Sequence, residues 1–272
     1  MPRGKSIVCK KGGQVNKNNS VKMIVTDLDG TLLKTDKSIS ENTKAILNRC
    51  REAGIKIVYA TGRGGSAERV APNEYFDGKI TMNGAVAKVD DVIVYSRLIP
   101  YQTARPVLMR CHERRIQITS EISGMHYSNF VVSDIWPLIT NYEVVDFAHH
   151  KLDAEKIYMP NPTHEVKLFI EQLLSDELYF VVTADGTGQL GQIMHKDATK
   201  SKAVSALAQH WNISQSEIVA FGDDLNDIDM LSYTGIGVAM GNSFNDVKVV
   251  ADYICDTNDN DGIVKWIEER IL

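Results

Sequence analysis

Residues Met23–Leu33 read Met-Ile-Val-Thr-Asp-Leu-Asp-Gly-Thr-Leu-Leu, an apolar run that ends in two carboxylates. Such a run is typical of a strand that is buried on both faces of a sheet. Asp27 and Asp29 stand at its end, and Gly30 marks a tight turn directly after them. Ligands of such sheets collect at the carboxyl ends of the strands, so we expect both carboxylates at the ligand-binding edge.

The two carboxylates repel each other unless a positive charge lies close to both of them. A divalent cation is expected there, because hard cations prefer oxygen ligands. The pentapeptide alone also fits a simpler interpretation, a strand followed by an acidic turn without chemistry, because short motifs produce false matches. The remainder of the chain has to distinguish the two.

Composition narrows the class of protein. The 272 residues can form one large core or two modest ones, and the 43% hydrophobic and 24% charged residues are ordinary for a globular protein. The net charge of −5 and the lack of a long basic stripe give no reason to expect a nucleic-acid partner. No apolar stretch approaches the roughly 20 residues that span a bilayer, so no membrane association is expected.

The four cysteines lie far apart and form no C-x-x-C pair. This spacing argues against a zinc site or a disulfide framework and suits a reducing cytoplasm. Residues 1–20 are basic, contain Gly and Asn, and lack the apolar segment of a signal peptide. They are therefore predicted to form a disordered tail.

A β-α-β unit follows the first strand. Ser40 is expected to cap a helix, Gly54 to end it, and 55–60 to form the next strand, parallel to the first. This strand runs into Thr61-Gly62-Arg63-Gly64-Gly65, where a hydroxyl, backbone amides and an arginine can bind an anion. A plain turn is the alternative. Position favours the anion site, because one β-α-β unit places the loop beside Asp27.

The middle of the chain has a different pattern. Strand-like segments follow one another between residues 86 and 190, including a pair around Ser123-Gly124, and a helix capped by Thr163 lies among them. This order predicts an inserted α+β domain with an antiparallel sheet. The isolated histidines of this segment are expected to be surface or core residues and not metal ligands.

The first pattern returns after residue 195. Lys200 and Lys202 open a predicted helix, where a lysine opposes the helix dipole unless an anion binds nearby. The strand 218–221 then runs into Gly222-Asp223-Asp224-Leu225-Asn226-Asp227, again acidic side chains at a strand end. The spacing of an EF-hand calcium loop is absent from this segment.

Four signals follow one another along the chain: Asp27-x-Asp29-Gly30-Thr31, Thr61-Gly62-Arg63, Lys200 and Gly222-Asp223-Asp224-Leu225-Asn226-Asp227. In this order they resemble the motifs of the haloacid dehalogenase superfamily, and their details resemble its Cof-like branch with a type IIB cap. The similarity extends from about Lys22 to Ile267. Further local matches are Ala60-Thr61-Gly62-Arg63, Met82-Asn83-Gly84-Ala85, Val238-Ala239-Met240-Gly241-Asn242 and Asp261-Gly262-Ile263. One departure concerns the residue after the motif lysine, which is usually glycine in this branch. Here Ser201 follows Lys200, and Lys202 is a possible substitute.

The resemblance implies an α/β fold, a Rossmann-like core with a doubly wound parallel sheet and an inserted α+β cap domain. The catalytic core would comprise residues 21–85 and 191–272, and the cap, which selects the substrate, residues 86–190. It also implies a magnesium-dependent phosphatase that hydrolyses a small phosphate ester, such as a sugar phosphate, through an aspartyl-phosphate.

The resemblance also implies a role for each motif residue. Asp27 would be the nucleophile and a metal ligand, and Asp29 the general acid and base that also offers its backbone carbonyl to Mg²⁺. Asp223 would complete the metal site. The phosphoryl oxygens would be held by Thr61, Gly62, Lys200 and Asn226, with Arg63 and Asp227 in support.

Two alternatives remain open. A phosphomutase or another phosphotransferase would use the same core and pass the phosphoryl group to a sugar. A catalytically silent phosphate-binding regulator is disfavoured, because every residue expected to react is present. The sequence does not define the natural ester, the cap residues that select it, or the oligomeric state.

Overall fold

The computed structural model describes residues 21–184 and 188–272, so the predicted disordered tail of residues 1–20 lies outside the described residues. The chain divides into two compact units. The first unit comprises the described residues up to Ile57 together with Ile213–Leu272, and the second comprises Val58–Asn212.

The helices are α1 (Glu41–Glu52), α2 (Tyr101–Glu113), α3 (His164–Leu173), α4 (Lys200–His210), α5 (Ile228–Tyr233), α6 (Asn245–Val250) and α7 (Gly262–Arg270). The strands of the first half are β1 (Met23–Thr26), β2 (Lys56–Ala60), β3 (Gly78–Thr81), β4 (Val86–Val89), β5 (Val92–Ser96), β6 (Thr119–Ile122) and β7 (Met125–Ser128). Those of the second half are β8 (Tyr142–Val144), β9 (Lys156–Pro160), β10 (Leu178–Ala184), β11 (Gln189–His195), β12 (Ile218–Gly222), β13 (Ile236–Ala239) and β14 (Tyr253–Ile254).

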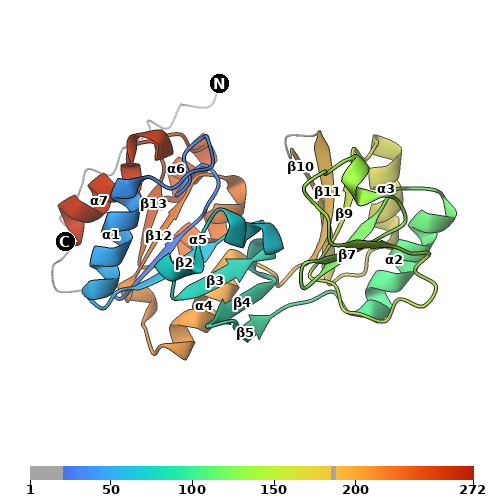
Figure 1. Ribbon diagram of the computed structural model, residues 1–272, viewed down its shortest axis with the longest axis horizontal. Coiled ribbons are helices and arrows are strands. Elements are labelled where there is room, and N and C mark those ends of the chain that lie inside the picture. The colour runs from blue at the N-terminus through green and yellow to red at the C-terminus, as the bar shows by residue number, and fades with distance from the viewer. Residues whose placement is uncertain (1–20, 185–187) are drawn as a thin grey trace, which may run out of the picture. The chain divides into compact units, whose positions relative to one another are not determined.

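The first unit is built on parallel strands in the order β14-β13-β12-β1. All four residues of β1 are buried, as expected for a central strand with both faces covered. Helix α1 begins where predicted, because the Ser40 side chain accepts a hydrogen bond from the Thr43 backbone N–H. Helices α1 and α7 lie side by side (Figure 1) and are joined by an ion pair of 2.9 Å between Arg49 and Glu268.

Helices cover both faces of this parallel sheet. The Phe221 ring of β12 packs against Trp266 of α7, with the ring centroids 5.3 Å apart. Gly237 of β13 lies under α5, where a Cβ would come within 2.4 Å of the Leu231 carbonyl oxygen. Gly237 pairs with the neighbour of Phe221 in the strand register, and successive residues of a strand point to opposite faces. The doubly wound arrangement predicted from the sequence is therefore confirmed.

The second unit contains two sheets. In the first, β2 and β3 are parallel, whereas β4 and β5 continue from β3 as antiparallel strands, with α4 packed against β3, β4 and β5. In the second, six strands follow the order β10-β11-β9-β6-β7-β8, and all neighbouring pairs are antiparallel except β7 and β8. The separate cap-type sheet expected from the sequence is confirmed.

The six-stranded sheet has one apolar face. Ile157 and Ile193, which are paired across β9 and β11, share a buried cluster with Leu108 of α2 and Ile170 of α3. Figure 1 shows both helices on the same side of the strands. The alternate residues of these strands point to the opposite face, where polar side chains predominate.

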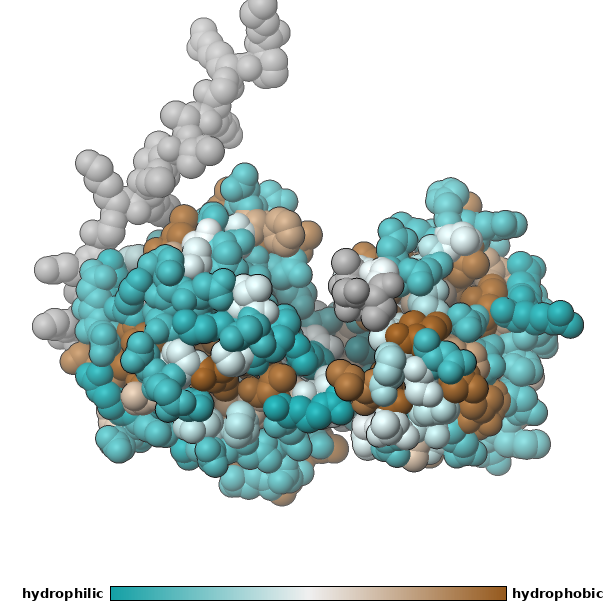
Figure 2. All heavy atoms as spheres, turned by 45° about the horizontal axis from the view of Figure 1, so that its top comes forward, coloured by the Kyte–Doolittle hydropathy of each residue, from teal (hydrophilic) through white to brown (hydrophobic). Residues whose placement is uncertain are grey.

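The limits of the predicted cap stay a prediction. Residues 86–96 were assigned to it, but β4 and β5 pair with β3 and not with the six-stranded sheet. Most of the surface in Figure 2 is hydrophilic, with hydrophobic residues in separate small groups. Among the described residues, none of the helices combines the length and hydrophobicity that a bilayer crossing requires.

Candidate active site

Two strand ends in the first unit bring acidic side chains together. Asp27 follows β1, and Asp223 follows the adjacent parallel strand β12. The Asp27 N–H donates to the Phe221 carbonyl at 3.0 Å, so strand pairing continues to the first carboxylate. Because parallel strands end at the same edge of a sheet, the pairing of β1 with β12 places these two acids side by side.

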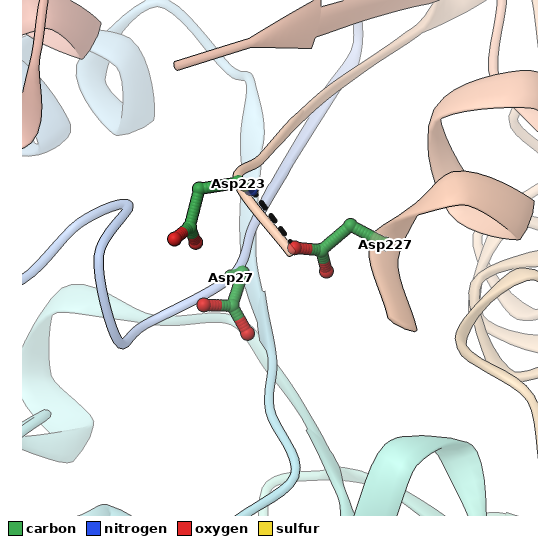
Figure 3. Close-up of side chains that lie close together, drawn as sticks. All are labelled: Asp27, Asp223 and Asp227. Carbon is green, nitrogen blue, oxygen red and sulfur yellow. Dashed lines mark hydrogen bonds between the residues drawn. The ribbon is translucent and has the colours of Figure 1, made fainter. Parts of the chain in front are cut away.

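Asp27, Asp223 and Asp227 form a carboxylate cluster. Each offers an oxygen atom, and these atoms all lie within 4.8 Å of one another. Figure 3 shows the three side chains converging from the ends of β1 and β12 and from the turn after β12. Asp27 and Asp227 are buried, and Asp223 is partly exposed. Three carboxylates so close together fit a hard divalent cation, which takes oxygen ligands and offsets their repulsion.

The turn after β12 is organised by Asp227. Its Oδ2 atom accepts hydrogen bonds from the backbone N–H groups of Asp223, at 2.9 Å, and Asp224, at 3.1 Å. The close approach needs Gly222, because a Cβ there would lie 2.5 Å from the Asp227 Cβ. The side chain expected to support the metal site therefore also fixes the direction of Asp223.

The Gly-Thr pair after Asp29 also serves Asp223. The Thr31 hydroxyl donates to the Asp223 Oδ1 atom at 2.7 Å. Gly30 has a φ of 81°, and a Cβ at this residue would lie 2.3 Å from the Asp223 Oδ2 atom. Gly30 and Thr31, in the turn after β1, thus hold the Asp223 carboxylate, which follows β12.

Asp29 has a partner that sequence reasoning missed. Its Oδ1 atom lies 2.7 Å from the Lys37 ammonium, and its side chain is 35% exposed. It is not a member of the carboxylate cluster found among the described residues, and its predicted metal ligand was the backbone carbonyl. Lys37 lies in a polar loop at a φ of 68°, and nothing in the local pattern distinguished it from a solvated lysine. Asn226 is exposed in the same turn as Asp227.

The second unit holds the predicted anion-binding segment. Thr61 is buried directly after β2, and its N–H donates to the Ile80 carbonyl at 2.9 Å. The Thr61 hydroxyl oxygen accepts from the Arg63 N–H at 3.2 Å. The turn after β3 supplies two more bonds, from the Met82 N–H to the Arg63 carbonyl and from the Asn83 N–H to the Thr61 carbonyl. The turn that follows β3 therefore supports this segment.

The structure distinguishes the two lysines at the start of α4. Lys200 is 1% exposed, whereas the side chain of Lys202 is 51% exposed and is paired with Asp197. Thr199 caps the helix by accepting from the Lys202 N–H. The burial of Lys200 favours it over Lys202 as the phosphate ligand, and this assignment remains a proposal.

Comparison with known proteins now defines the class. The family model for haloacid dehalogenase-like hydrolases matches residues 24–267. The chain belongs to this family of hydrolases. A putative phosphatase of Haemophilus influenzae is 29% identical over 92% of this chain and 98% of its own length.

Two further relatives also match over nearly their full length. The 5-amino-6-(5-phospho-D-ribitylamino)uracil phosphatase YcsE of Bacillus subtilis is 27% identical over 93% of this chain and 96% of its own. The structure of the subclass IIB sugar phosphatase BT4131 has a TM-score of 0.75 and is 26% identical, covering 91% of this chain and 98% of that one. The enzyme is accordingly a phosphatase of the Cof-like, subclass IIB type.

Proposed function

We propose that this enzyme hydrolyses a small phosphorylated metabolite with Mg²⁺, through a phosphorylated Asp27. The carboxylate cluster of Asp27, Asp223 and Asp227 supports this proposal most directly. Its oxygen donors suit a hard cation, and one of them belongs to the side chain expected to react. The names of the full-length relatives favour a sugar phosphate or a similar compound as the substrate.

Mg²⁺ would be held by the carboxylates of Asp27 and Asp223 and by the backbone carbonyl of Asp29, with Asp227 in support. When bound, the ion offsets negative charge between the attacking carboxylate and the phosphate. Asp227 already receives two backbone N–H groups, so it adds charge to the site without having to move.

Asp27 would start the reaction. One of its carboxylate oxygens attacks phosphorus, the ester P–O bond breaks, and the phosphoryl group becomes bound to Asp27. Asp29, in its protonated form, gives its proton to the leaving alkoxide. The resulting Asp29 carboxylate then takes a proton from water, whose oxygen attacks phosphorus and releases inorganic phosphate and free Asp27.

The phosphoryl oxygens would be held by Thr61, Gly62, Lys200 and Asn226, with Arg63 in support. The Arg63 N–H donates to the Thr61 hydroxyl oxygen, which leaves the hydroxyl proton available for a phosphoryl oxygen. We further propose that residues 86–190 act as the substrate-selecting cap and that the enzyme works in the cytoplasm.

The test combines a panel of phosphate esters with chelation of divalent cations and trapping of the intermediate. Ester hydrolysis should stop after chelation and return when Mg²⁺ is added, and Ca²⁺ should inhibit because its larger coordination shell misplaces the nucleophile. Rapid acid quenching should yield protein phosphorylated on Asp27, detected by mass spectrometry. Full turnover in the chelated enzyme would contradict the metal requirement. Transfer to an added sugar in preference to water would favour a mutase.

A further inference from the structure

The polar face of the six-stranded sheet carries a row of buried ionisable side chains. Lys156 of β9, Glu121 of β6 and His126 of β7 lie directly opposite one another in the strand register. Their residues are 8%, 5% and 9% exposed. The Lys156 ammonium lies 4.0 Å from Glu121 Oε2, and His126 Nδ1 lies 2.8 Å from the Tyr158 hydroxyl. A polar sheet face is normally open to water, so burial of this row calls for an explanation.

This row lies against the segment that follows β2. The Lys156 ammonium donates to the Gly62 carbonyl at 3.5 Å. Glu121 accepts a hydrogen bond from the Gly65 backbone N–H. The carboxylate also packs so closely on Gly64 that a Cβ there would lie 2.2 Å from Glu121 Oε1. Two charged side chains of the sheet thus contact Gly62, Gly64 and Gly65 of the predicted phosphate-binding loop.

The contact with Gly62 bears on the Thr61 hydroxyl. The C=O of Gly62 and the N–H of Arg63 belong to one planar trans peptide and point in opposite directions. Lys156 holds the carbonyl end of this peptide, and the Thr61 hydroxyl oxygen accepts from the N–H end at 3.2 Å. The Gly62–Arg63 peptide therefore connects the Thr61 hydroxyl to a lysine that lies 94 residues beyond Gly62 in the chain.

The other carbonyls of the segment are held differently. Backbone N–H groups of Met82 and Asn83 donate to the carbonyls of Arg63 and Thr61. The carbonyl between them, that of Gly62, receives its bond from the Lys156 side chain. Lys156 and Glu121 therefore both link the six-stranded sheet to the loop, and Lys156 does so through the Gly62 carbonyl.

We propose that Lys156, held in place by Glu121, is a positioning residue that orients the Thr61–Gly65 loop for phosphate binding. This inference rests on the proposed phosphatase function. It differs from direct selection of the leaving group, because Lys156 acts on the phosphoryl group through the Gly62–Arg63 peptide and does not itself touch substrate.

Two features of the surroundings support this role. A cavity of about 190 Å³ is lined by Gly64, Gly65 and Gly124, among others, so apolar packing does not fill the space beside the loop. Burial also makes the pair mutually dependent. Removing Lys156 would leave the Glu121 carboxylate buried beside a His126 whose pKa burial lowers to about 4, which keeps that ring neutral near pH 7.

Binding of inorganic phosphate tests the proposal, because phosphate has no leaving group. Its affinity is measured by calorimetry with Mg²⁺ present, for the wild type and for Lys156→Met, Lys156→Arg and Lys156→Gln. We expect the Met variant to bind phosphate roughly tenfold more weakly, as for loss of a hydrogen bond from a charged donor, and the Arg variant to approach the wild type. The Gln variant keeps a donor and should lie between them.

The matched control is Lys167→Met, an exposed lysine of α3 in the same unit, which should leave phosphate affinity unchanged. KM values for two esters with different alcohols should rise by the same factor as the phosphate dissociation constant. An unchanged phosphate affinity, with a KM change for one ester only, would overturn the proposal and make Lys156 a leaving-group contact. If Lys156→Met does not fold, Glu121→Gln replaces it, with a smaller expected loss of phosphate affinity.

A wild-type protein that hydrolyses no ester but loses phosphate affinity on Lys156 substitution would contradict the proposed hydrolysis and keep this inference. The alternative result is that the wild type hydrolyses esters while Lys156→Met has the same phosphate affinity and the same KM. This result would contradict the role of Lys156 and leave the proposed hydrolysis intact.

Discussion

Two groups of ionisable side chains differ in how their buried acids are stabilised. One is the carboxylate cluster of the first unit, and the other is the polar row of the six-stranded sheet, formed by Lys156, Glu121 and His126. Asp227 is satisfied by two backbone N–H groups at the end of a strand. Glu121 stands within a strand whose backbone pairs with β7 and β9, and its nearest charged partner is the side chain of Lys156. Asp227 thus depends on backbone donors of its own turn, whereas Glu121 depends on a side chain of a neighbouring strand together with the Gly65 N–H.

This difference indicates at which of the two sites a single residue can be substituted without loss of its neighbours' hydrogen bonds. At a strand end, backbone donors belong to the turn itself, so a substitution that keeps the shape and the acceptor oxygen of an acid leaves these hydrogen bonds in place. Within a sheet the backbone groups are used by the ladder, so each buried charge depends on its neighbours. We therefore expect substitutions of the same shape in the first site to affect mainly chemistry and metal binding, and those in the second to affect phosphate affinity and stability as well.

The largest effect is expected from Asp27→Asn. An amide cannot form the phosphoenzyme, so turnover should fall by at least about 10⁴-fold with little change in the free energy of unfolding. Initial rates and urea unfolding check both parts. Asp246→Asn, an exposed acid of α6, is the matched control and should keep normal activity. Substantial turnover by Asp27→Asn would exclude a covalent role for this residue.

Asp29→Asn should come next, with a loss that depends on the ester. An alkyl phosphate releases a basic alkoxide and needs the proton, so its hydrolysis should fall by roughly 10²- to 10⁴-fold. The nitrophenolate of p-nitrophenyl phosphate leaves without help, so phosphorylation of Asp27 should continue while the following hydrolysis slows. The phosphoenzyme should then accumulate, which rapid quench and mass spectrometry can measure. Equal losses on both esters, without the adduct, would mean that Asp29 acts on the metal alone.

The sequence allowed the first site to be predicted because its parts lie in short motifs. Asp27 and Asp223 follow apolar strands, and adjacent parallel strands bring such ends together without any detail of side-chain packing. Even there, the Lys37 partner of Asp29 was missed, since a lysine in a polar loop carries no pattern. The contact between Lys156 and Gly62 could not be predicted at all. It depends on strand register within the second sheet and on how a loop packs against that sheet, and neither leaves a local signal.

Two substitutions of Asp227 distinguish its structural role in the turn from its role in metal binding. Asp227→Ala leaves the N–H groups of Asp223 and Asp224 without their acceptor and should lower the free energy of unfolding by about 2–4 kcal/mol. Asp227→Asn keeps an oxygen that can accept both bonds, so stability should change little while the affinity for Mg²⁺ falls roughly tenfold to hundredfold with the lost charge. Metal titration monitored by calorimetry, with urea unfolding, distinguishes these effects. Equal Mg²⁺ affinity in Asp227→Asn and the wild type would exclude Asp227 from the metal environment.

A smaller effect is expected at the polar row, where the free energy of unfolding should depend on pH. Burial lowers the pKa of His126 from its ordinary value of 6.5 to about 4, and the charge of Lys156 acts in the same direction. The unfolded chain therefore binds a proton at this residue before the folded protein does. Stability should be highest above pH 6.5 and should decline as the pH falls from there toward 4. Burial raises the pKa of Glu121, which opposes this trend because the folded protein then takes up a proton more readily than the unfolded chain.

His126→Gln isolates the histidine contribution, because Glu121 and the other histidines are present in both proteins. Between pH 7 and pH 4.5 the wild type should lose about 2 kcal/mol more unfolding free energy than His126→Gln, and urea unfolding at the two pH values measures the difference. Glutamine keeps a polar group opposite Glu121 and near the Tyr158 hydroxyl, so that the row is not broken by the change itself. His149→Gln, at an exposed histidine of the same unit, is the matched control and should reproduce the pH dependence of the wild type. If His126→Gln shows the same pH dependence as well, His126 is protonated as easily in the folded protein as in water. The row would then have to be open to solvent, and its burial could not explain why Lys156 is directed at Gly62.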